Sequence, residues 1–297
     1  MNKVIIIGFG YVGLQVAKAE LAQGRHVTAL VRSHDKAHIA LTEHITPHWA
    51  DLDDTRTLHN LDTSEADLYY FAPPPNDGVS DSRLRAFLTT LTPAKRPRAL
   101  LYISTTGVYG ANSTTQILTE ESPTLACQPR ALRRLDAEAA LHEWHTHHPT
   151  THLTILRVAG IYGPAKLPLE RIKRGEPVLE ASHRSLINLI HIDDLTQVCL
   201  AALRSDHNRS LYNVCDGHPV TMTDYLRAIA HAFQLPQPPS ITLQEASQQL
   251  SPGFLSYLQE SRRISNEKML RQLQITLHYP SYLLGIQSCV HLTSLSH

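Results

Sequence analysis

The residues with the clearest chemical meaning form a glycine-rich turn near the start of the chain. The segment Gly8-Phe9-Gly10-Tyr11-Val12-Gly13 fits the pattern Gly-x-Gly-x-x-Gly and lies between an apolar run and an amphipathic stretch. In that context the first glycine permits a tight turn, the second lets the backbone approach a pyrophosphate, and the third allows a helix to pack closely on a strand. Backbone N–H groups at the helix start would face the phosphates. The segment predicts a dinucleotide site; the alternative is a glycine turn without a ligand.

The end of the second apolar run bears on which dinucleotide binds. Arg32 stands where an NAD-specific protein usually carries an acidic residue against the adenosine ribose. A guanidinium suits a 2′-phosphate, and Ser33 could be a second donor, so NADP is favoured and NAD is the alternative. Asp35 could contact the ribose instead, or it could cap the short helix that follows.

Two further segments are expected beside the same cofactor. Asp51 could accept a hydrogen bond from the adenine amino group while Leu52 packs on the ring, and capping of the next helical stretch is the alternative for Asp51. Trp49 is expected next to the adenine. After the strand expected at 67–71, small Ala72 and rigid Pro73 would leave room for the cofactor.

These groups require a sheet whose strand ends meet at one edge. Short apolar, β-rich runs alternate with helical patterns, as a parallel sheet covered on both faces requires. The expected strands are 3–8, 26–31, 67–71, 99–104 and 152–158, and the helices between them include 12–23 and 131–145. We therefore predict an α/β protein with a doubly wound parallel (Rossmann) sheet.

The later part of the chain has a less regular pattern. Expected elements there are strands 186–190 and 211–214 and helices 193–204 and 223–233. We expect residues 1–163 to form the Rossmann domain, with 185–215 contributing to it. Residues 164–184 and 216–286 would form a smaller, mixed α/β substrate region, and 287–297 a loose tail.

The composition argues against several classes of protein. The 27 basic and 27 acidic residues cancel, so neither nucleic acid nor a membrane surface is an expected partner. No apolar run approaches the roughly 18 residues of a membrane span, and no secretory signal precedes the first strand. The four cysteines lack any Cys-x-x-Cys pair, which favours reduced thiols. We expect a soluble, cytoplasmic monomer or homodimer with a small-molecule substrate.

A histidine-rich segment, His142–His148, suggests a metal site, but its spacing does not fit one. A helical zinc site of the protease type needs two histidines four residues apart, whereas the intervals from His142 are three and then five. We expect a solvated helix end before Pro149 and no metal.

Several motifs follow the glycine turn in a recognisable order over residues 1–286. They are Tyr102–Gly110, Leu156–Pro164, Asn188–Leu195, Tyr212–Val214, Arg263–Asn266 and Tyr279–Tyr282. In this order they resemble the extended and atypical short-chain dehydrogenase/reductases, the superfamily that includes NAD-dependent epimerases and dehydratases. The Gly-x-Gly spacing is closer to the atypical branch. The resemblance implies an NAD(P)-dependent oxidoreductase or epimerase acting on a sugar-nucleotide-like or small carbonyl or alcohol substrate.

The family's chemistry uses a hydroxyl after the fifth strand and a Tyr-x-x-x-Lys pair on the next helix. Thr105 matches the hydroxyl, and the neighbouring Ser104 is expected among the cofactor contacts. Alignment on Glu138 puts Arg130 at the tyrosine position and Arg134 at the lysine position. Because arginine stays protonated, Arg130 cannot replace tyrosine as a general base.

The arginines on this helix have two possible uses. Arg134 could hold a ribose hydroxyl, and Arg130 with Arg133 could clamp a substrate carboxylate or phosphate. The alternative is an exposed, arginine-rich helix in which Arg134 pairs with Glu138 four residues on.

A formal Tyr-x-x-x-Lys pattern starts at Tyr162, after the strand expected at 152–158, but Pro164 argues against a helix there. The resemblance places Tyr162 in the cleft near the nicotinamide. His191 could act as a base, although packing or capping is favoured, and water is a third candidate proton carrier. A cofactor-binding sensor or regulatory module without turnover remains the alternative to an enzyme.

Overall fold

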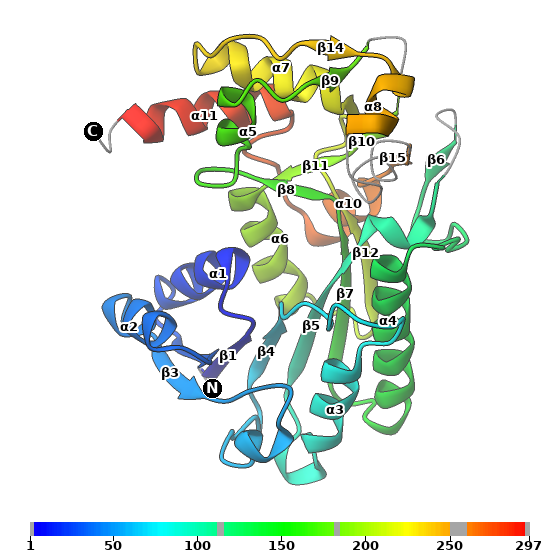
Figure 1. Ribbon diagram of the computed structural model, residues 1–297. Helices are drawn as coiled ribbons and strands as arrows, with labels where there is room; N and C mark the ends of the chain where they lie inside the picture. The colour runs from blue at the N-terminus through cyan, green and yellow to red at the C-terminus, as the bar shows by residue number, and fades with distance from the viewer. Residues whose placement is uncertain (1–2, 112–115, 181–184, 250–259, 295–297) are drawn as a thin grey trace. The chain divides into compact units, whose positions relative to one another are not determined.

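The computed structural model describes residues 3–111, 116–180, 185–249 and 260–294 (Figure 1). By its internal contacts the chain divides into two compact units. The first unit comprises Met1–Val108, Ala126–Arg157 and Thr196–Tyr212. The second unit comprises Tyr109–Leu125, Val158–Leu195 and Asn213–His297. These bounds assign residues 109–125, 158–163 and 185–195 to the second unit, whereas the sequence analysis expected residues 1–163 and 185–215 in the Rossmann domain.

A seven-stranded sheet is the centre of the fold, in the order β3-β2-β1-β4-β5-β7-β12. β1 pairs in parallel with β2 on one side and with β4 on the other, so the strand order reverses at β1. β2 with β3 and β4 with β5 are also parallel pairs. The strands are β1 (Lys3–Ile7), β2 (His26–Val31), β3 (Thr46–Trp49), β4 (Asp67–Tyr70), β5 (Ala99–Thr105), β7 (His152–Val158) and β12 (Ser210–Val214). The doubly wound fold is confirmed.

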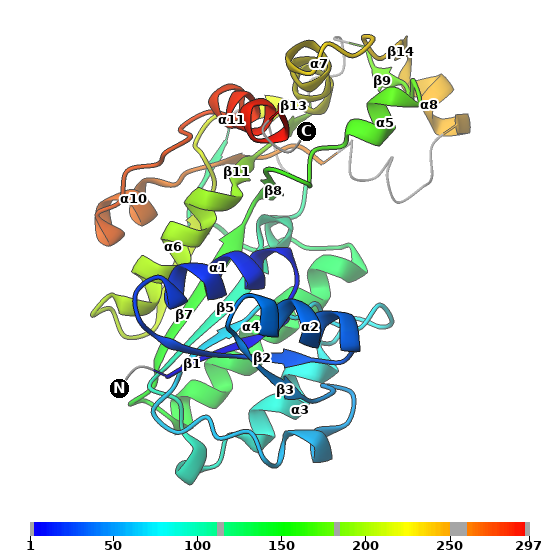
Figure 2. The same ribbon diagram turned by 90° about the vertical axis from the view of Figure 1, so that its left-hand side faces the viewer.

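Helices cover both faces of this sheet. Figure 2 shows α1 and α2 on the opposite side of the sheet from α3 and α4. The helices are α1 (Tyr11–Leu21), α2 (His34–Thr42), α3 (Ser82–Thr90), α4 (Pro129–His147) and α6 (Ile192–Arg204), with 3₁₀ turns η1 (Thr55–Leu58), η2 (Pro93–Lys95) and η3 (Thr106–Tyr109). On the α3 and α4 side, Tyr70, Phe87, Tyr102 and Leu141 belong to one fully buried apolar cluster. That cluster packs α3 and α4 against β4 and β5.

The second unit is a mixed α/β assembly of short elements. β8 (Gly160–Tyr162) pairs in parallel with β11 (Leu189–His191), and β10 (Leu186–Ile187) pairs antiparallel with β13 (Val220–Thr221). β9 (Val178–Leu179) pairs with β14 (Ser240–Ile241), and β6 (Ile117–Leu118) pairs with β15 (Arg263–Ile264). Its helices are α5 (Leu169–Lys173), α7 (Met222–Ala232), α8 (Leu243–Gln249), α10 (Glu267–Leu273) and α11 (Tyr282–Ser294).

Two expectations for this later region are wrong. The strand predicted at 186–190 is two strands, because the Asn188 side chain interrupts it by donating to Arg262 O and accepting from Ile264 N. The expected loose tail begins inside helix α11, in which Ile286 and Cys289 are each only 1% exposed. Ile286 belongs to a buried apolar cluster of the second unit that also includes Tyr162, Leu226 and Ile229.

No helix in the described part of the chain is both long enough and apolar enough to cross a membrane.

Candidate dinucleotide-binding site

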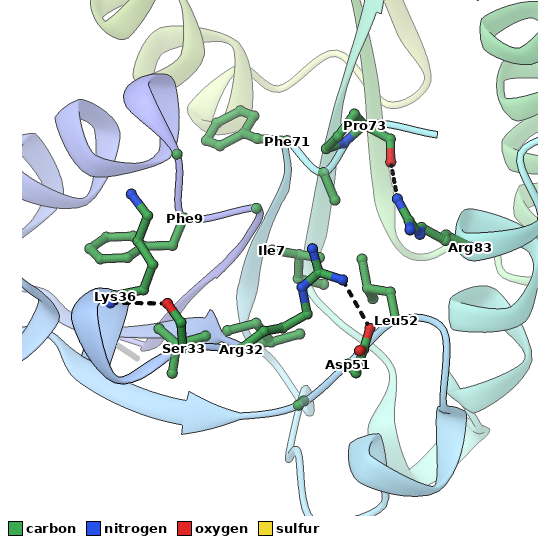
Figure 3. Close-up of a pocket in the computed structure, with 16 residues that line it drawn as sticks. Ile7, Phe9, Arg32, Ser33, Lys36, Asp51, Leu52, Phe71, Pro73 and Arg83 are labelled. Atoms are coloured by element: carbon green, nitrogen blue, oxygen red, sulfur yellow. Dashed lines mark hydrogen bonds and ion pairs between the residues drawn. The ribbon is translucent and has the colours of Figure 1, made fainter. Parts of the chain in front are cut away.

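A cavity of about 680 Å³ lies in the first unit, where β1, β2 and β4 end (Figure 3). Its lining comes from residues 7–10, 30–33, 50–52 and 71–73, together with Lys36 and Arg83. In a doubly wound sheet, ligands bind at the carboxyl ends of the strands where the strand order reverses. The cavity occupies that position beside β1.

Most of the cofactor contacts predicted from the sequence meet at this cavity. Those that line it are Gly8, Phe9, Gly10, Arg32, Ser33, Asp51, Leu52, Ala72 and Pro73. Tyr11, Val12, Gly13 and Ser104 are outside the lining. The first three belong to the first turns of α1, directly beside the lining residue Gly10.

The three glycines of the turn have different steric surroundings. Gly8 has φ +96°, and a Cβ atom there would overlap the backbone of Phe71 and Ala72. A Cβ atom on Gly13 would overlap the Gly8 carbonyl oxygen, whereas nothing lies within 4 Å of the corresponding position on Gly10. Gly8 and Gly13 are therefore needed for packing, and Gly10 leaves open space at the cavity wall.

The start of α1 is built to receive an anion. Gly10 is its N-cap, with no side-chain capping hydrogen bond and no acidic residue in the first turn. The first amides of a helix have no intrahelical acceptor, and the helix dipole places positive potential there. Backbone N–H groups next to an open glycine fit a diphosphate.

A second cationic region borders the cavity where β2 continues into α2. Ser33 is the N-cap of α2, and its Oγ accepts from Lys36 N at 3.3 Å. The cap is therefore Ser33 and not Asp35. Arg32 and Lys36 also line the cavity. Lys36 was not among the predicted contacts; its position three residues after the cap places it in the first turn of α2, on the same side as Ser33.

The loop after β3 carries the acidic side of the cavity. Asp51 Oδ1 accepts from Asp53 N at 3.0 Å and lies 3.4 Å from Arg32 Nη1. Asp54 caps η1, so the capping alternative for Asp51 is wrong. Trp49, which was expected next to the adenine, does not line the cavity. It is 49% exposed and lies with its ring 5.0 Å from that of His34.

Arg83 is a lining residue that the sequence did not indicate. From α3 it donates through Nε and Nη2 to the two Asp53 oxygens at 2.7 Å each, and its Nη1 lies 3.4 Å from Pro73 O. These hydrogen bonds lower the pKa of Asp53. Arg83 thereby links the loop after β3 to the chain after β4, across 30 residues of sequence.

The groups at the end of β5 are mostly engaged with the protein itself. Ser104 is buried, and its hydroxyl donates to Glu138 on α4, which argues against its predicted cofactor contact. Glu138 also forms a buried ion pair with Arg157 on β7, with Nη2 and Oε2 2.7 Å apart. The half-buried Thr105 accepts from Gly107 N at 3.1 Å through Oγ1.

Arg134 lies against β5, and the alternative in which it pairs with Glu138 is wrong. Its Nη1 donates to Tyr102 Oη at 3.0 Å and to Ile103 O at 2.9 Å. Burial raises the pKa of the Tyr102 hydroxyl, so this tyrosine stays protonated. The acceptors that hold the guanidinium belong to β5. The i,i+4 spacing rule considers only residues on the same helix and could not predict them. Arg130 is exposed, and Arg133 donates to Gly78 O at 2.7 Å.

Tyr162 and His191 belong to the second unit, where they pack on each other with ring centroids 5.2 Å apart. Tyr162 is 1% exposed, burial raises its pKa, and its hydroxyl has no hydrogen-bond partner among the described residues. Lys166 follows it in a turn with Ala165 at φ +63°, not on a shared helical face. His191 accepts from Asp193 N at 3.3 Å through Nδ1, and burial lowers its pKa. This geometry favours packing for both residues.

Within the described ranges, no three His, Cys, Asp or Glu side chains are grouped so that they could hold a metal ion. The histidine-rich segment His142–His148 lies on α4 and just beyond its end.

Comparison with known proteins identifies the family. The model of the NAD dependent epimerase/dehydratase family matches residues 4–215. The chain belongs to this family. That match confirms the resemblance seen in the sequence motifs and covers all seven strands of the large sheet.

Individual proteins that are similar to this chain share limited sequence identity with it. Protein YeeZ of Escherichia coli is 26% identical over 235 residues, which cover 76% of this chain and 82% of YeeZ. A conserved protein of unknown function from Silicibacter pomeroyi has a TM-score of 0.84 and 24% identity over 99% of both chains. A UDP-glucose 4-epimerase from Thermotoga maritima has a TM-score of 0.80 and 15% identity, and the match covers 100% of this chain and 99% of that one. These structural likenesses show the fold.

Proposed function

We propose that this family member binds NADP(H) in the cavity of the first unit and is an oxidoreductase or epimerase. Its substrate would be sugar-nucleotide-like or a small carbonyl or alcohol compound. The observation that carries the proposal is the open glycine turn at the start of α1 together with Arg32, Ser33 and Lys36 around one cavity. A dinucleotide with a 2′-phosphate needs both an anion site at a helix start and a cationic site at the ribose.

Each part of the cavity has a stated role in holding the cofactor. Amides from Tyr11 to Gly13 would bind the diphosphate, and Asp51 and Leu52 would contact the adenine. Ala72 and Pro73 would form the wall along which the cofactor passes. When bound, the nicotinamide supplies hydride transfer, while the protein supplies binding and orientation.

The proposed reaction lacks the proton carrier that the family usually places on the helix after β5. Helix α4 contains neither tyrosine nor lysine, and Arg130 and Arg134 stand at the expected positions. Thr105 would donate to the reacting oxygen of the substrate, and the arginines would contribute positive charge. Because a guanidinium does not exchange its proton near neutral pH, and Tyr162 is buried, we assign proton transfer to water.

The test of cofactor choice is a pair of dissociation constants. NADPH should bind more tightly than NADH, and Arg32→Asp should reverse or abolish that preference. Arg56→Asp is the matched control, because Arg56 is an 84% exposed arginine outside the cavity. Equal affinity of the wild type for both nucleotides would refute the assignment of Arg32.

The test of catalysis is single-turnover oxidation or reduction of bound cofactor across nucleotide sugars and small carbonyl compounds. A substrate should change the nicotinamide absorbance, and Thr105→Ala should slow that change without weakening cofactor binding. Thr106→Ala is a suitable control, because Thr106 is a buried neighbour outside the proposed roles.

A second candidate function is a cofactor-binding sensor that turns nothing over. The observation that favours it is that Arg134 donates hydrogen bonds to Tyr102 and Ile103. The residue at the family's lysine position is therefore bound to the sheet. Tight NADPH binding with no absorbance change over the whole panel would favour the sensor. Turnover of any one compound would exclude it.

A further inference from the structure

Two carboxylates face the Arg32 guanidinium at the edge of the cavity. Arg32 Nη1 lies 3.4 Å from Asp51 Oδ1 and 3.8 Å from Asp53 Oδ2, and Figure 3 shows Arg32 pointing toward Asp51. The side chains of Arg32, Asp51 and Asp53 are 61%, 44% and 50% exposed. Exposed pairs of this kind are weak. Arg32 can therefore leave these carboxylates for another anion without disturbing the fold.

Asp53 is held in place more firmly than Arg32. Both of its carboxylate oxygens accept from Arg83, whose side chain is only 22% exposed. Such a two-point hydrogen bond between a guanidinium and a carboxylate fixes orientation as well as distance. Asp53 therefore cannot easily turn away when an anion approaches Arg32. It is also outside the cavity lining, so its effect on a ligand would act through its two arginine partners that line the cavity, Arg32 and Arg83.

We propose that Asp53, positioned by Arg83, determines how strongly the chain prefers NADPH by competing with the cofactor's 2′-phosphate for Arg32. The inference rests on the proposed cofactor site. Binding NADPH would require Arg32 to exchange a carboxylate for the phosphate, whereas NADH, which has no 2′-phosphate, makes no such demand. Asp53 would thus weaken NADPH binding selectively and act as a specificity-determining residue.

The neighbouring residue offers a matched control. Asp54 has the same charge and lies in the same loop, but it pairs with Arg56 at 2.8 Å and neither residue lines the cavity. Asp54→Asn removes one negative charge next to Asp53 and keeps an oxygen that can cap η1. Both substitutions remove one negative charge. A difference in NADPH affinity between the two variants would therefore reflect the position of the carboxylate and not the net charge.

The experiment measures dissociation constants for NADPH and NADH, by nicotinamide fluorescence, in the full-length protein and its variants. Asp53→Asn should tighten NADPH binding by about 1.4- to fivefold, the range expected for release of an exposed ion pair. NADH binding should stay unchanged, and Asp54→Asn should alter neither constant. In an Arg32→Gln background, Asp53→Asn should no longer change the affinity for NADPH.

The outcomes separate this inference from the proposed function. If the wild type binds neither nucleotide, the cofactor site itself is wrong and the inference falls with it. If the wild type binds NADPH but Asp53→Asn shifts both nucleotides equally, or shifts neither, the site stands and the competition is refuted. A tightening that persists in the Arg32→Gln background would show that Asp53 acts without Arg32, by direct repulsion of the phosphate or through Arg83, and would also overturn the competition.

Discussion

Gly10→Ala separates the binding role of the glycine turn from its structural role. Gly10 has φ −98°, which alanine adopts without strain, and nothing lies within 4 Å of the Cβ position. Alanine is a poorer N-cap than glycine, which destabilises the folded state by about 1 kcal/mol. Alanine also loses less backbone entropy on folding, which stabilises the folded state by about 0.4–1 kcal/mol. These effects oppose each other, so the free energy of unfolding should change by less than about 1 kcal/mol.

Binding should respond much more strongly than folding to this methyl group. It would occupy the space through which a diphosphate approaches the backbone, so at least one charge-assisted hydrogen bond should be lost. Such a bond contributes about 1.5–3 kcal/mol. The dissociation constant for NADPH should therefore rise about tenfold to 150-fold.

The assay combines NADPH titration with thermal unfolding of the same sample. Gly24→Ala, just past the other end of α1, is the control. Gly24 has φ +74° and open space around its Cβ position, so alanine there should lower the unfolding temperature and leave the dissociation constant unchanged. A Gly10→Ala variant that binds NADPH like the wild type would refute the placement of the diphosphate.

Three further predictions concern stability. Glu138→Gln leaves the buried Arg157 without its counter-charge, so the first unit should lose about 3–5 kcal/mol; an unchanged unfolding temperature would contradict this. Gly285→Ala should destabilise the second unit by about 1–3 kcal/mol, measured by urea unfolding, because the new Cβ would overlap the Tyr162 ring; a silent substitution would mean that α11 does not pack there. Burial raises the pKa of Asp216 from 3.8 to about 7, so between these values the folded chain keeps a proton that the unfolded chain has released. The free energy of unfolding should fall with rising pH across that window, by roughly 4 kcal/mol in all, and Asp216→Asn should abolish this part of the pH dependence; an identical pH profile in the variant would refute it.

The sequence by itself determined the features that depend on residues close together along the chain. A glycine turn between a buried strand and a helix is a local pattern, and it predicted the part of the cavity formed by residues 8–10. Apart from the strand at 186–190, which is two strands, the strands and helices predicted from periodicity are present with ends shifted by a residue or two, because burial of one face gives a regular apolar pattern in the sequence. The order of motifs likewise indicated the family that the comparison identified.

Only the tertiary structure decided which charges meet. The local spacing rule paired Arg134 with Glu138, but the fold gives Glu138 to Arg157 and places Arg134 on β5. Arg83 reaches Asp53 across 30 residues, and no local pattern encodes that contact. Pairing of long charged side chains depends on which strand and helix ends the fold brings within a few ångströms, and this is set by the order of strands in the sheet. Helix α11 escaped notice for the same reason, since its apolar residues acquire a buried face only when the second unit packs around them.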